Sequence, residues 1–350
     1  MGRITIRTIA KELGLSATAV SHALRNRPNI GLATRERVQA KARELGYRPN
    51  AMVQALMADL RQQSRSDTLV PIAVVYSEPK IPHGLNWQRP AMDEEAEKMG
   101  YRLDDFFGVG EQMRPERLLQ ILQSRNISSM ILQPQLGPSD FKEGSLANFA
   151  LAGFNYSSAA SRMHRASLHH SMDMDQVVKK IFGAGFRRPG FITTESTDRS
   201  TKSRWVGRFF SLMWERGDLS PDAVLCYSQE RGLTIAELAS WHNRYRADSL
   251  IVADHETLRV LEAWFDGSQP WIPIACMNIW WKGSRFSGNR QNLRGVVRES
   301  VRLLVEQLHL GQCGIPDSPR TVLLPGKWVE GESLGSAPVR LERRLKPCDP

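Results

Sequence analysis

The chain has few cysteines and no long apolar run. Its 350 residues include only four cysteines, Cys226, Cys276, Cys313 and Cys348. They show neither CxxC spacing nor cysteine/histidine spacing, so we expect no disulfide framework and a reducing compartment. No 18-residue apolar stretch and no apolar signal region after the first methionine is present. These absences favour a cytoplasmic protein that neither is secreted nor spans a membrane.

Signatures of enzymes and metal sites are also missing. The sequence has no GxGxxG motif, phosphate-binding loop or GxSxG motif at a strand-to-helix junction. Serine, histidine and acidic residues form no recognisable catalytic arrangement. His164, His169 and His170 have no cysteine or carboxylate partner at ligand spacing. We therefore expect no enzymatic activity, no cofactor and no metal.

Basic charge is concentrated near the N-terminus. Residues 1–63 contain eleven arginines and lysines against four acidic residues, which accounts for most of the net charge of +10. A surface that only has to be soluble usually carries positive and negative charges side by side. Binding to DNA phosphates requires a local excess of positive charge. This segment is therefore expected to bind nucleic acid.

Capping signals in the same segment predict three short helices. Thr5 is a good N-cap, apolar residues recur at helical spacing over 6–13, and Gly14 stands where a helix often ends. Ser16 can cap a second helix immediately, so the turn between the two helices is tight. We expect Thr34 to cap a third helix.

The second expected helix has one apolar and one polar face. Val20, Ala23 and Leu24 fall on the apolar face. The opposite face consists of small and polar residues, Thr18, Ser21, His22 and Arg25. Such a face can approach a DNA groove closely, although an ordinary helical bundle with solvated polar faces is the alternative.

Residues 1–60 closely resemble the lactose-repressor and purine-repressor (LacI/GalR) family of bacterial transcription regulators. The matching positions are Ile9-Ala10, Gly14-Leu15-Ser16, Val20-Ser21, Thr34-Arg35, Leu45-Gly46-Tyr47, Pro49-Asn50 and Leu56. In that family the second helix enters the major groove, so the resemblance assigns base contacts to Ala17, Thr18 and His22. It assigns contacts with the DNA backbone to Thr5, Ser16, Ser21, Asn26, Asn29 and Thr34. His22 replaces an arginine that is common in the family, so we expect a different operator sequence.

A fourth amphipathic segment follows Asn50, with apolar residues at helical spacing over 53–60. The resemblance implies a hinge helix that pairs with the hinge of a second subunit in the minor groove. Leu56, with Val53 beside it, would contact the minor groove there and wedge between base pairs. The alternative is that Leu56 packs only within the protein. Residues 62–68 are polar and aperiodic and indicate a linker.

From residue 69 onwards, short apolar strands alternate with amphipathic helices, which predicts parallel sheets covered by helices. The expected strands are 72–76, 101–107, 129–133, 149–154, 189–193, 223–227, 249–253, 272–277 and 321–324. The expected helices are 90–99, 115–125, 203–216, 234–246, 255–265 and 292–310. About 280 residues are enough for two cores.

The predicted fold is thus an N-terminal all-α helix-turn-helix head on a two-lobed α/β core. The resemblance implies that this core is similar to a periplasmic binding protein. The expected segments are a DNA-binding domain over 1–49, a hinge and linker over 50–68, an effector-binding and dimerisation core over 69–333, and a basic flexible tail over 334–350.

Effector contacts are assigned by the resemblance and by the aromatic residues near strand ends. Arg204 stands at a family arginine that binds effector oxygens, and Asn278 replaces an aspartate that accepts hydrogen bonds from sugar hydroxyls. Asn155 and Asp173 occupy further pocket positions. Trp87 and Trp280 offer flat faces for stacking on a ring. Alternatively, Arg204 pairs with an acid on its own helix and the tryptophans pack against neighbours.

Four further tryptophans lie within helical periods and are expected in the core, namely Trp205, Trp214, Trp241 and Trp264.

Together these features predict a homodimeric, ligand-responsive transcription regulator, a repressor that binds a pseudo-palindromic double-stranded operator. Its effector is expected to be a sugar or sugar derivative bound between the two lobes, acting as inducer or corepressor. A solute-binding protein for transport is an alternative, but it would need an export signal and would have no use for the head. A regulator controlled by a protein partner is another.

Overall fold

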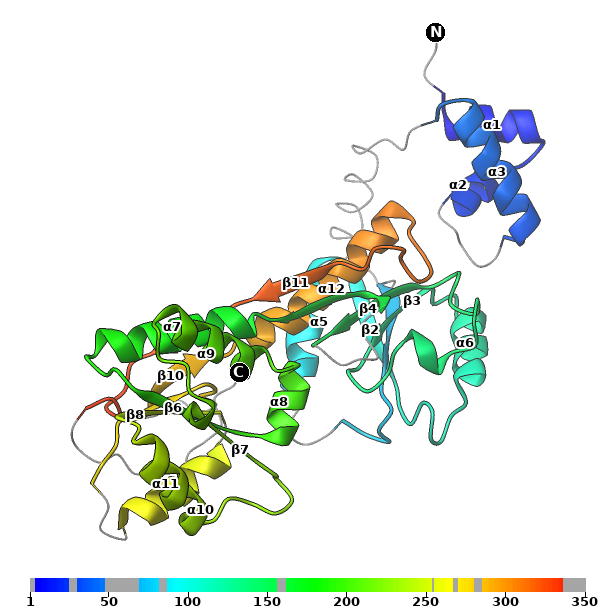
Figure 1. Cartoon of the computed structure of the whole chain (residues 1–350). Helices are drawn as coiled ribbons and strands as arrows, with labels where there is room; N and C mark the ends of the chain where they lie inside the picture. The colour runs from blue at the N-terminus through cyan, green and yellow to red at the C-terminus, as the bar shows by residue number, and fades with distance from the viewer. Residues whose placement is uncertain are drawn as a thin grey trace. The chain divides into compact units, whose positions relative to one another are not determined.

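The computed structural model describes residues 4–24, 30–47, 69–81, 87–155, 162–253, 255–266, 270–279 and 285–335 (Figure 1). The chain divides into two compact units, one of Met1–Ser167 with Arg294–Val322 and one of Leu168–Leu293 with Leu323–Pro350. Several predicted features lie outside the described residues: the hinge with Val53 and Leu56, the tail from residue 336, Asn26, Asn29 and Trp280.

The head contains three helices, α1 (Ile6–Leu13), α2 (Ala17–Leu24) and α3 (Leu32–Glu44). Two predicted caps are confirmed. Thr5 accepts a hydrogen bond from the backbone N–H of Thr8 at 3.3 Å, and Ser16 Oγ accepts one from Ala19 at 3.0 Å. Gly14 ends α1 with a left-handed φ of 65°, which glycine adopts without strain. The small core is made of Ile9, Ala10, Val20, Ala23, Val38 and Ala42.

The predicted cap of the third helix is wrong. Helix α3 begins at Leu32, with Gly31 as its N-cap and no side-chain capping bond, so Thr34 lies inside the first turn. Gly31 already has the extended backbone that a cap requires (φ −58°, ψ 147°), and its carbonyl accepts the N–H of Arg35 at 3.0 Å. The helix therefore starts before Thr34 can cap it.

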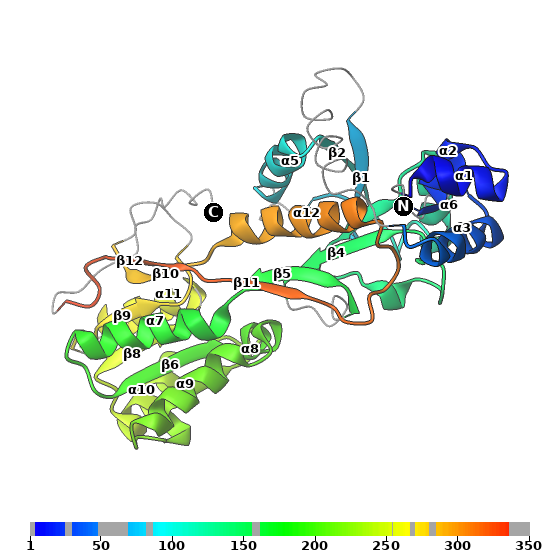
Figure 2. The same ribbon diagram turned by 90° about the horizontal axis from the view of Figure 1, so that it is seen from above.

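The first sheet has the strand order β11-β5-β4-β3-β1-β2, and the pairings among β1 to β5 are parallel. Its strands are β1 (Val70–Val75), β2 (Tyr101–Phe106), β3 (Ser129–Leu132), β4 (Ala150–Phe154), β5 (His164–Leu168) and β11 (Thr321–Leu324). Its helices are α5 (Gln88–Lys98), α6 (Pro115–Ser124) and α12 (Leu293–Leu310), with a short 3₁₀ turn at Pro138–Asp140. Figure 2 shows α12 running alongside this sheet.

The second sheet has the order β12-β10-β9-β8-β6-β7 and is parallel except for the antiparallel pair β10–β12. Its strands are β6 (Pro189–Thr194), β7 (Val224–Tyr227), β8 (Ser249–Val252), β9 (Ile274–Cys276), β10 (Ser287–Arg290) and β12 (Lys327–Val329). Its helices are α7 (His170–Gly183), α8 (Glu195–Thr201), α9 (Arg204–Glu215), α10 (Ile235–Tyr245) and α11 (His255–Asp266), with a 3₁₀ turn at Pro221–Ala223.

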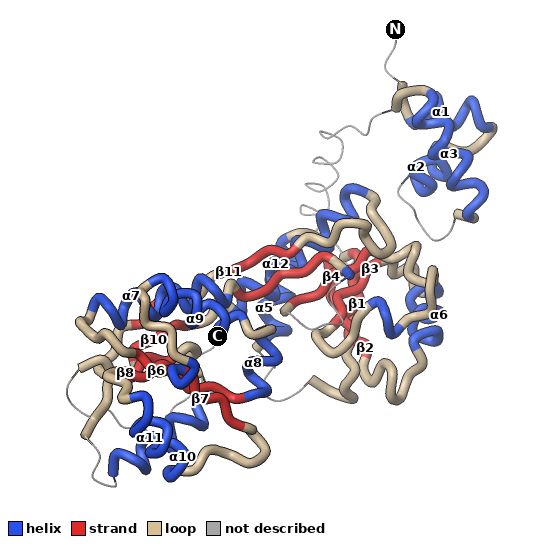
Figure 3. Tube along the Cα trace, in the orientation of Figure 1, coloured by secondary structure: helices blue, strands red, loops and turns tan. Residues whose placement is uncertain are grey.

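Helices cover both faces of the second sheet. Helices α7 and α9 lie on one face and α10 and α11 on the other (Figures 1 and 3). The strands approach so closely at Gly288 that a Cβ there would collide with the backbone of Cys276. The predicted combination of an all-α head with two mainly parallel α/β units is confirmed.

Some elements and one core residue differ from the prediction. Strands β5, β10 and β12 and helices α7 and α8 were not predicted. Trp205, Trp241 and Trp264 are buried as expected, but Trp214 is 73% exposed. Helix α9 buries Trp205, Phe209 and Met213. Trp214 comes directly after Met213, and one residue along a helix turns the side-chain direction by about 100°, here toward solvent.

Candidate DNA-binding surface and ligand-binding strand ends

The outer face of α2 carries the side chains predicted to contact bases. Ala17 and Thr18 are exposed and His22 is half-buried. Val20 and Ala23, on the opposite side of the same helix, have no exposed surface. The core therefore orients the helix, and its polar face is left available. That these side chains contact bases stays a prediction.

The start of α2 also suits an anionic partner. Ser16 Oγ satisfies the backbone N–H of Ala19 at 3.0 Å, which leaves the first N–H groups of the helix to other acceptors. The first turn contains no acidic side chain. The positive end of the helix dipole is therefore not neutralised locally, and a DNA phosphate can accept hydrogen bonds there.

Several basic side chains in the described part of the head are available for phosphates. Lys41 pairs with Glu44 at 2.8 Å, and the hydrogen bond to that carboxylate raises the pKa of Lys41. Arg7, Lys11 and Arg43 are exposed, and none of them forms an ion pair with any residue that the structure describes. The positive charge of these three side chains is thus uncompensated within the described residues.

In the first unit, polar and aromatic residues follow neighbouring strands. Asn155 follows β4 with a left-handed φ of 65°, and its N–H donates to the carbonyl of Ala166 at 2.8 Å. Gln133 follows β3 and is only 2% exposed. Tyr76 after β1 stacks on Phe107 after β2, with ring centroids 4.7 Å apart. These residues share the carboxyl edge of the sheet, where ligands bind in open parallel sheets.

Sequence reasoning placed Asn155 near this edge but missed Gln133 and Tyr76. Their position directly after buried strands is the signal that could have identified them. Trp87, the predicted stacking residue, is the N-cap residue of α5 and is half-buried.

In the second unit, Arg204 is the first residue of α9. Lys202 and Ser203, directly before it, have left-handed φ values of 54° and 53°, a costly conformation for residues with side chains. The guanidinium donates to the carbonyl of Thr201 at 3.3 Å. Asn278 lies in the segment just after β9, which places it near the carboxyl edge of this sheet.

His170 is part of the surroundings of Arg204. Its ring packs edge-on against Trp205, with centroids 5.1 Å apart. Burial, reinforced by the positive charge of Arg204, lowers the pKa of His170 to about 4. The imidazole is therefore neutral at physiological pH, and Arg204 remains the cation of this region.

Asp173, another residue predicted to contact the ligand, is buried. It lies on α7 with no exposed surface, and its Oδ1 accepts the backbone N–H of Gly326 at 2.7 Å. Burial raises its pKa to about 6. A side chain at Gly326 would collide with the buried amide of Asn289. Asp173 thus joins α7 to the turn before β12, and its contact with a ligand stays a prediction.

The described ranges contain neither a membrane-spanning helix nor a metal cluster. No helix there is long and apolar enough to cross a membrane. No cluster of three or more histidine, cysteine, aspartate or glutamate side chains could hold a metal ion in the same ranges. Cys226, Cys276 and Cys313 form no disulfide bond within these ranges.

Comparisons with known proteins agree with the architecture. The family model described as "Bacterial regulatory proteins, lacI family" matches residues 5–50. The HTH-type transcriptional regulator RafR of Escherichia coli is 28% identical over 131 residues. That alignment spans 37% of this chain and 37% of the relative's length, so it covers only part of either protein.

Solved structures match over nearly the whole chain. The lac repressor dimer bound to operator and the anti-inducer ONPF has a TM-score of 0.53 at 17% identity, covering 95% of this chain and 99% of that one. The complex of the transcriptional regulator CelR with cellobiose has a TM-score of 0.54 at 17% identity, covering 95% and 100%. At such identities the similarity establishes the fold. Residues 5–50 thus match the lacI-family model, and the chain as a whole has the fold of these two solved regulators.

Proposed function

We propose that this chain is a ligand-responsive, DNA-binding transcription regulator, a repressor that acts in the cytoplasm as a homodimer on a pseudo-palindromic operator. The observation that carries the proposal is the exposed polar face of α2 in a basic, lacI-family head. We assign the protein no catalytic activity.

In this proposal the head binds duplex DNA in two ways. Ala17, Thr18 and His22 contact base edges in the major groove and specify sequence. Thr5, Ser16, Ser21 and Thr34, together with the unpaired cations of the head, contact the DNA backbone and fix the register. We propose that Asn26 and Asn29 also contact the DNA backbone. His22 offers one ring nitrogen as donor or acceptor in place of the bidentate fork of arginine, so the preferred base differs.

The hinge segment over 50–68 is proposed to pair with its copy in a second subunit. Leu56 and Val53 would then contact the minor groove, and Leu56 would open a base step. Replacing Leu56 by alanine should weaken operator binding severely without unfolding the protein. Unchanged affinity in a gel-shift titration would refute the wedge.

The ligand is proposed to contact the carboxyl-edge residues of the sheets and the start of α9. Arg204 supplies a planar fork that suits a carboxylate or vicinal hydroxyls. Asn278 and Asn155 can both donate and accept hydrogen bonds, and Trp87 and Trp280 can stack on a ring. A sugar derivative, in particular a sugar acid, fits this set better than a cationic ligand does.

A ligand can regulate DNA binding only through its different affinities for the DNA-bound and free states. The proposal therefore requires that the ligand change the equilibrium between them. A ligand that binds equally well to both states would leave repression unchanged, however tightly it bound.

The proposal is tested by selecting duplexes from a random DNA library with the purified protein. We expect a two-fold symmetric consensus, bound with an affinity that falls steeply as salt increases. A panel of sugars, sugar acids and nucleobases is then screened by thermal shift, and each compound that binds is added to the operator titration. A failure to enrich any sequence would refute the DNA-binding assignment. Selected DNA whose binding no ligand in the panel alters would refute a sugar-type effector.

A further inference from the structure

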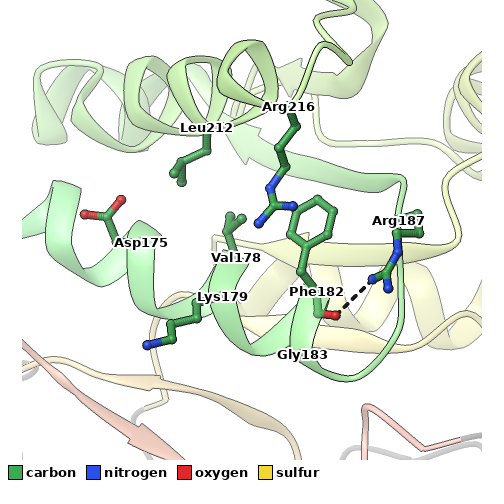
Figure 4. Close-up of a pocket in the computed structure, with 8 residues that line it drawn as sticks. All are labelled: Asp175, Val178, Lys179, Phe182, Gly183, Arg187, Leu212 and Arg216. Atoms are coloured by element: carbon green, nitrogen blue, oxygen red, sulfur yellow. Dashed lines mark hydrogen bonds between the residues drawn. The ribbon is translucent and has the colours of Figure 1, made fainter.

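The second unit contains a groove that the proposed function does not use. It lies between the C-terminal halves of α7 and α9 and has a volume of about 550 Å³ (Figure 4). Val178 from α7 and Leu212 from α9 form apolar walls, and Phe182 lies beside them. The volume falls in the range of small-molecule sites.

Cationic side chains dominate the polar part of this groove. Lys179, Arg187 and Arg216 contribute three positive charges, whereas Asp175 is the one carboxylate among the lining residues. Asp175 already pairs with Arg208, with 2.5 Å between its Oδ1 and the arginine Nε. The groove is therefore positively charged in the absence of a ligand.

The arginine at the end of α9 is held in position by an aromatic ring. The guanidinium carbon of Arg216 lies 3.7 Å from the centroid of the Phe182 ring, a distance at which a cation and a ring attract each other. Figure 4 shows this guanidinium over Phe182, next to the apolar side chains. Stacking on the ring leaves the edge of the guanidinium, with its N–H donors, free to meet an anion.

Neutralisation of helix ends does not account for all of this charge. Helices α7 and α9 both end here, and their terminal carbonyls carry partial negative charge. Arg187 serves that purpose, since its Nη1 donates to the carbonyls of Phe182 at 3.0 Å and Phe186 at 2.9 Å. Lys179 and Arg216 donate to no acceptor within the described ranges. Their N–H donors are therefore available to a ligand.

We propose that this groove binds a small anion that consists of a phosphate or carboxylate group on an apolar ring or chain. The charged group accepts hydrogen bonds from Arg216 and Lys179, and charge-assisted bonds of this kind are the strong ones. The apolar part packs against Leu212 and Phe182, which line the groove and are both partly exposed. A bare inorganic ion would satisfy the cations but leave the apolar walls in contact with water.

The groove is separate from the ligand contacts proposed above. Arg204 begins α9 and Arg216 follows its last residue, and the helix has 12 residues. The two arginines are thus about 18 Å apart along the helix axis. The inference therefore does not depend on the proposed function.

The test is a binding titration of the full-length protein with phenyl phosphate and with benzoate. Binding is measured by ligand-observed NMR and by calorimetry. Inorganic phosphate tests the charge alone, and benzyl alcohol tests the ring alone. The groove variant is Lys179→Gln combined with Arg216→Gln. The matched control is Arg231→Gln, which removes an exposed arginine on the same unit, paired with Glu237 in the native protein.

We expect phenyl phosphate or benzoate to bind more tightly than inorganic phosphate or benzyl alcohol, and more weakly at high salt. The double variant should lose roughly tenfold or more in affinity, while the control should bind as the native protein does. Comparing the two anions identifies the preferred head group. Equal binding by the double variant, no binding of either aromatic anion, or equally tight binding of inorganic phosphate would each overturn the proposal.

Discussion

In the head, the side chains proposed to meet the bases come from one helix of eight residues, α2. In the two α/β units, the proposed ligand contacts follow strands that are far apart in the sequence, such as β4 and β9. Changing the DNA sequence that is bound therefore requires few substitutions on one helix face. Changing the ligand requires several loops to change together. In the proposed function, specificity for DNA is thus local in the chain, whereas specificity for the ligand depends on the tertiary fold.

The two regions also differ in how much core supports them. Within the described residues, the head buries only a few apolar side chains, the largest of them Ile9, while the second unit has an extended core with several aromatic rings. Small cores leave little reserve of stability. A core mutation that the second unit tolerates should therefore unfold the head.

The largest expected effect comes from a matched pair of core substitutions. Ile9 in α1 and Ile251 in β8 both have no exposed surface, so replacing either by alanine costs about 2–5 kcal/mol. We expect Ile9→Ala to unfold the head and abolish operator binding, while Ile251→Ala leaves its unit folded at room temperature. Thermal unfolding and hydrogen exchange distinguish the two. Retained operator binding by Ile9→Ala would contradict the idea that the head is the less stable region.

The next effect concerns pH and the second unit. The pKa of Asp173 rises from 3.8 to about 6 on folding. Between these two pH values the folded protein therefore keeps the carboxyl proton, whereas the unfolded chain has released it. This contribution to stability is present below about pH 4 and is lost as the pH rises through 6. The Asp173→Asn variant has no titrating group at this position, so its stability does not fall in this way. Between pH 4 and 7 the free energy of unfolding of the variant, relative to that of the native protein, should therefore rise by about 2–3 kcal/mol.

Denaturant unfolding of Asp173→Asn at several pH values checks this prediction, with the exposed Asp222→Asn as the matched control. His170 acts in the opposite direction, because its lowered pKa costs stability as the pH falls from 6.5 towards 4. The native protein is therefore expected to be less sensitive to acid than the Asp173 variant. A constant stability difference across this pH range would mean that Asp173 titrates normally.

A smaller effect is expected on the side of α2 that we propose faces DNA. His22→Ala should cost about 1–3 kcal/mol of discrimination at one base-pair position and leave binding to nonspecific DNA nearly unchanged. Ala40→Ser, an uncharged change at an exposed position on α3, serves as the control. Competition between the selected operator and single-position variants measures the effect. Equal losses for specific and nonspecific DNA would show that His22 contacts the phosphate backbone instead.

The smallest effect concerns ligand preference. Asn278→Asp introduces a carboxylate that accepts stronger hydrogen bonds from sugar hydroxyls than an amide does. We expect the preference to move from sugar acids toward neutral sugars by about tenfold, or roughly 1.4 kcal/mol. Calorimetry with one compound of each kind measures this ratio. An unchanged ratio would place Asn278 outside the ligand contacts.

The parts that sequence reasoning predicted well depend on local interactions. Thr5, Ser16 and Gly14 act within one helical turn, so their capping roles could be recognised from neighbouring residues. The prediction that Thr34 caps the third helix was wrong because Gly31, three residues earlier, already has the required extended backbone. Local capping rules identify candidates for a helix start but do not decide between two of them.

Features that depend on tertiary packing were harder to predict. Trp214 follows a helical period of apolar residues yet faces solvent, because α9 buries only the stripe that faces the sheet. Asp173 is buried by packing, and Gly326, 153 residues away, donates its N–H to it. Strands β10 and β12 are short and contain polar residues, so their sequences lack the apolar alternation that identified the others. The groove between α7 and α9 exists only once two distant helices pack together.

The central claim, sequence-specific DNA binding by the head, is tested most directly by measuring affinity for the selected operator as a function of salt. If each head contacts several phosphates, a plot of log K against log salt concentration should fall with a slope of about −5 or steeper. Scrambled DNA of equal length should bind at least about a thousandfold more weakly than the operator. A nearly flat plot, or equal affinity for operator and scrambled DNA, would contradict the account.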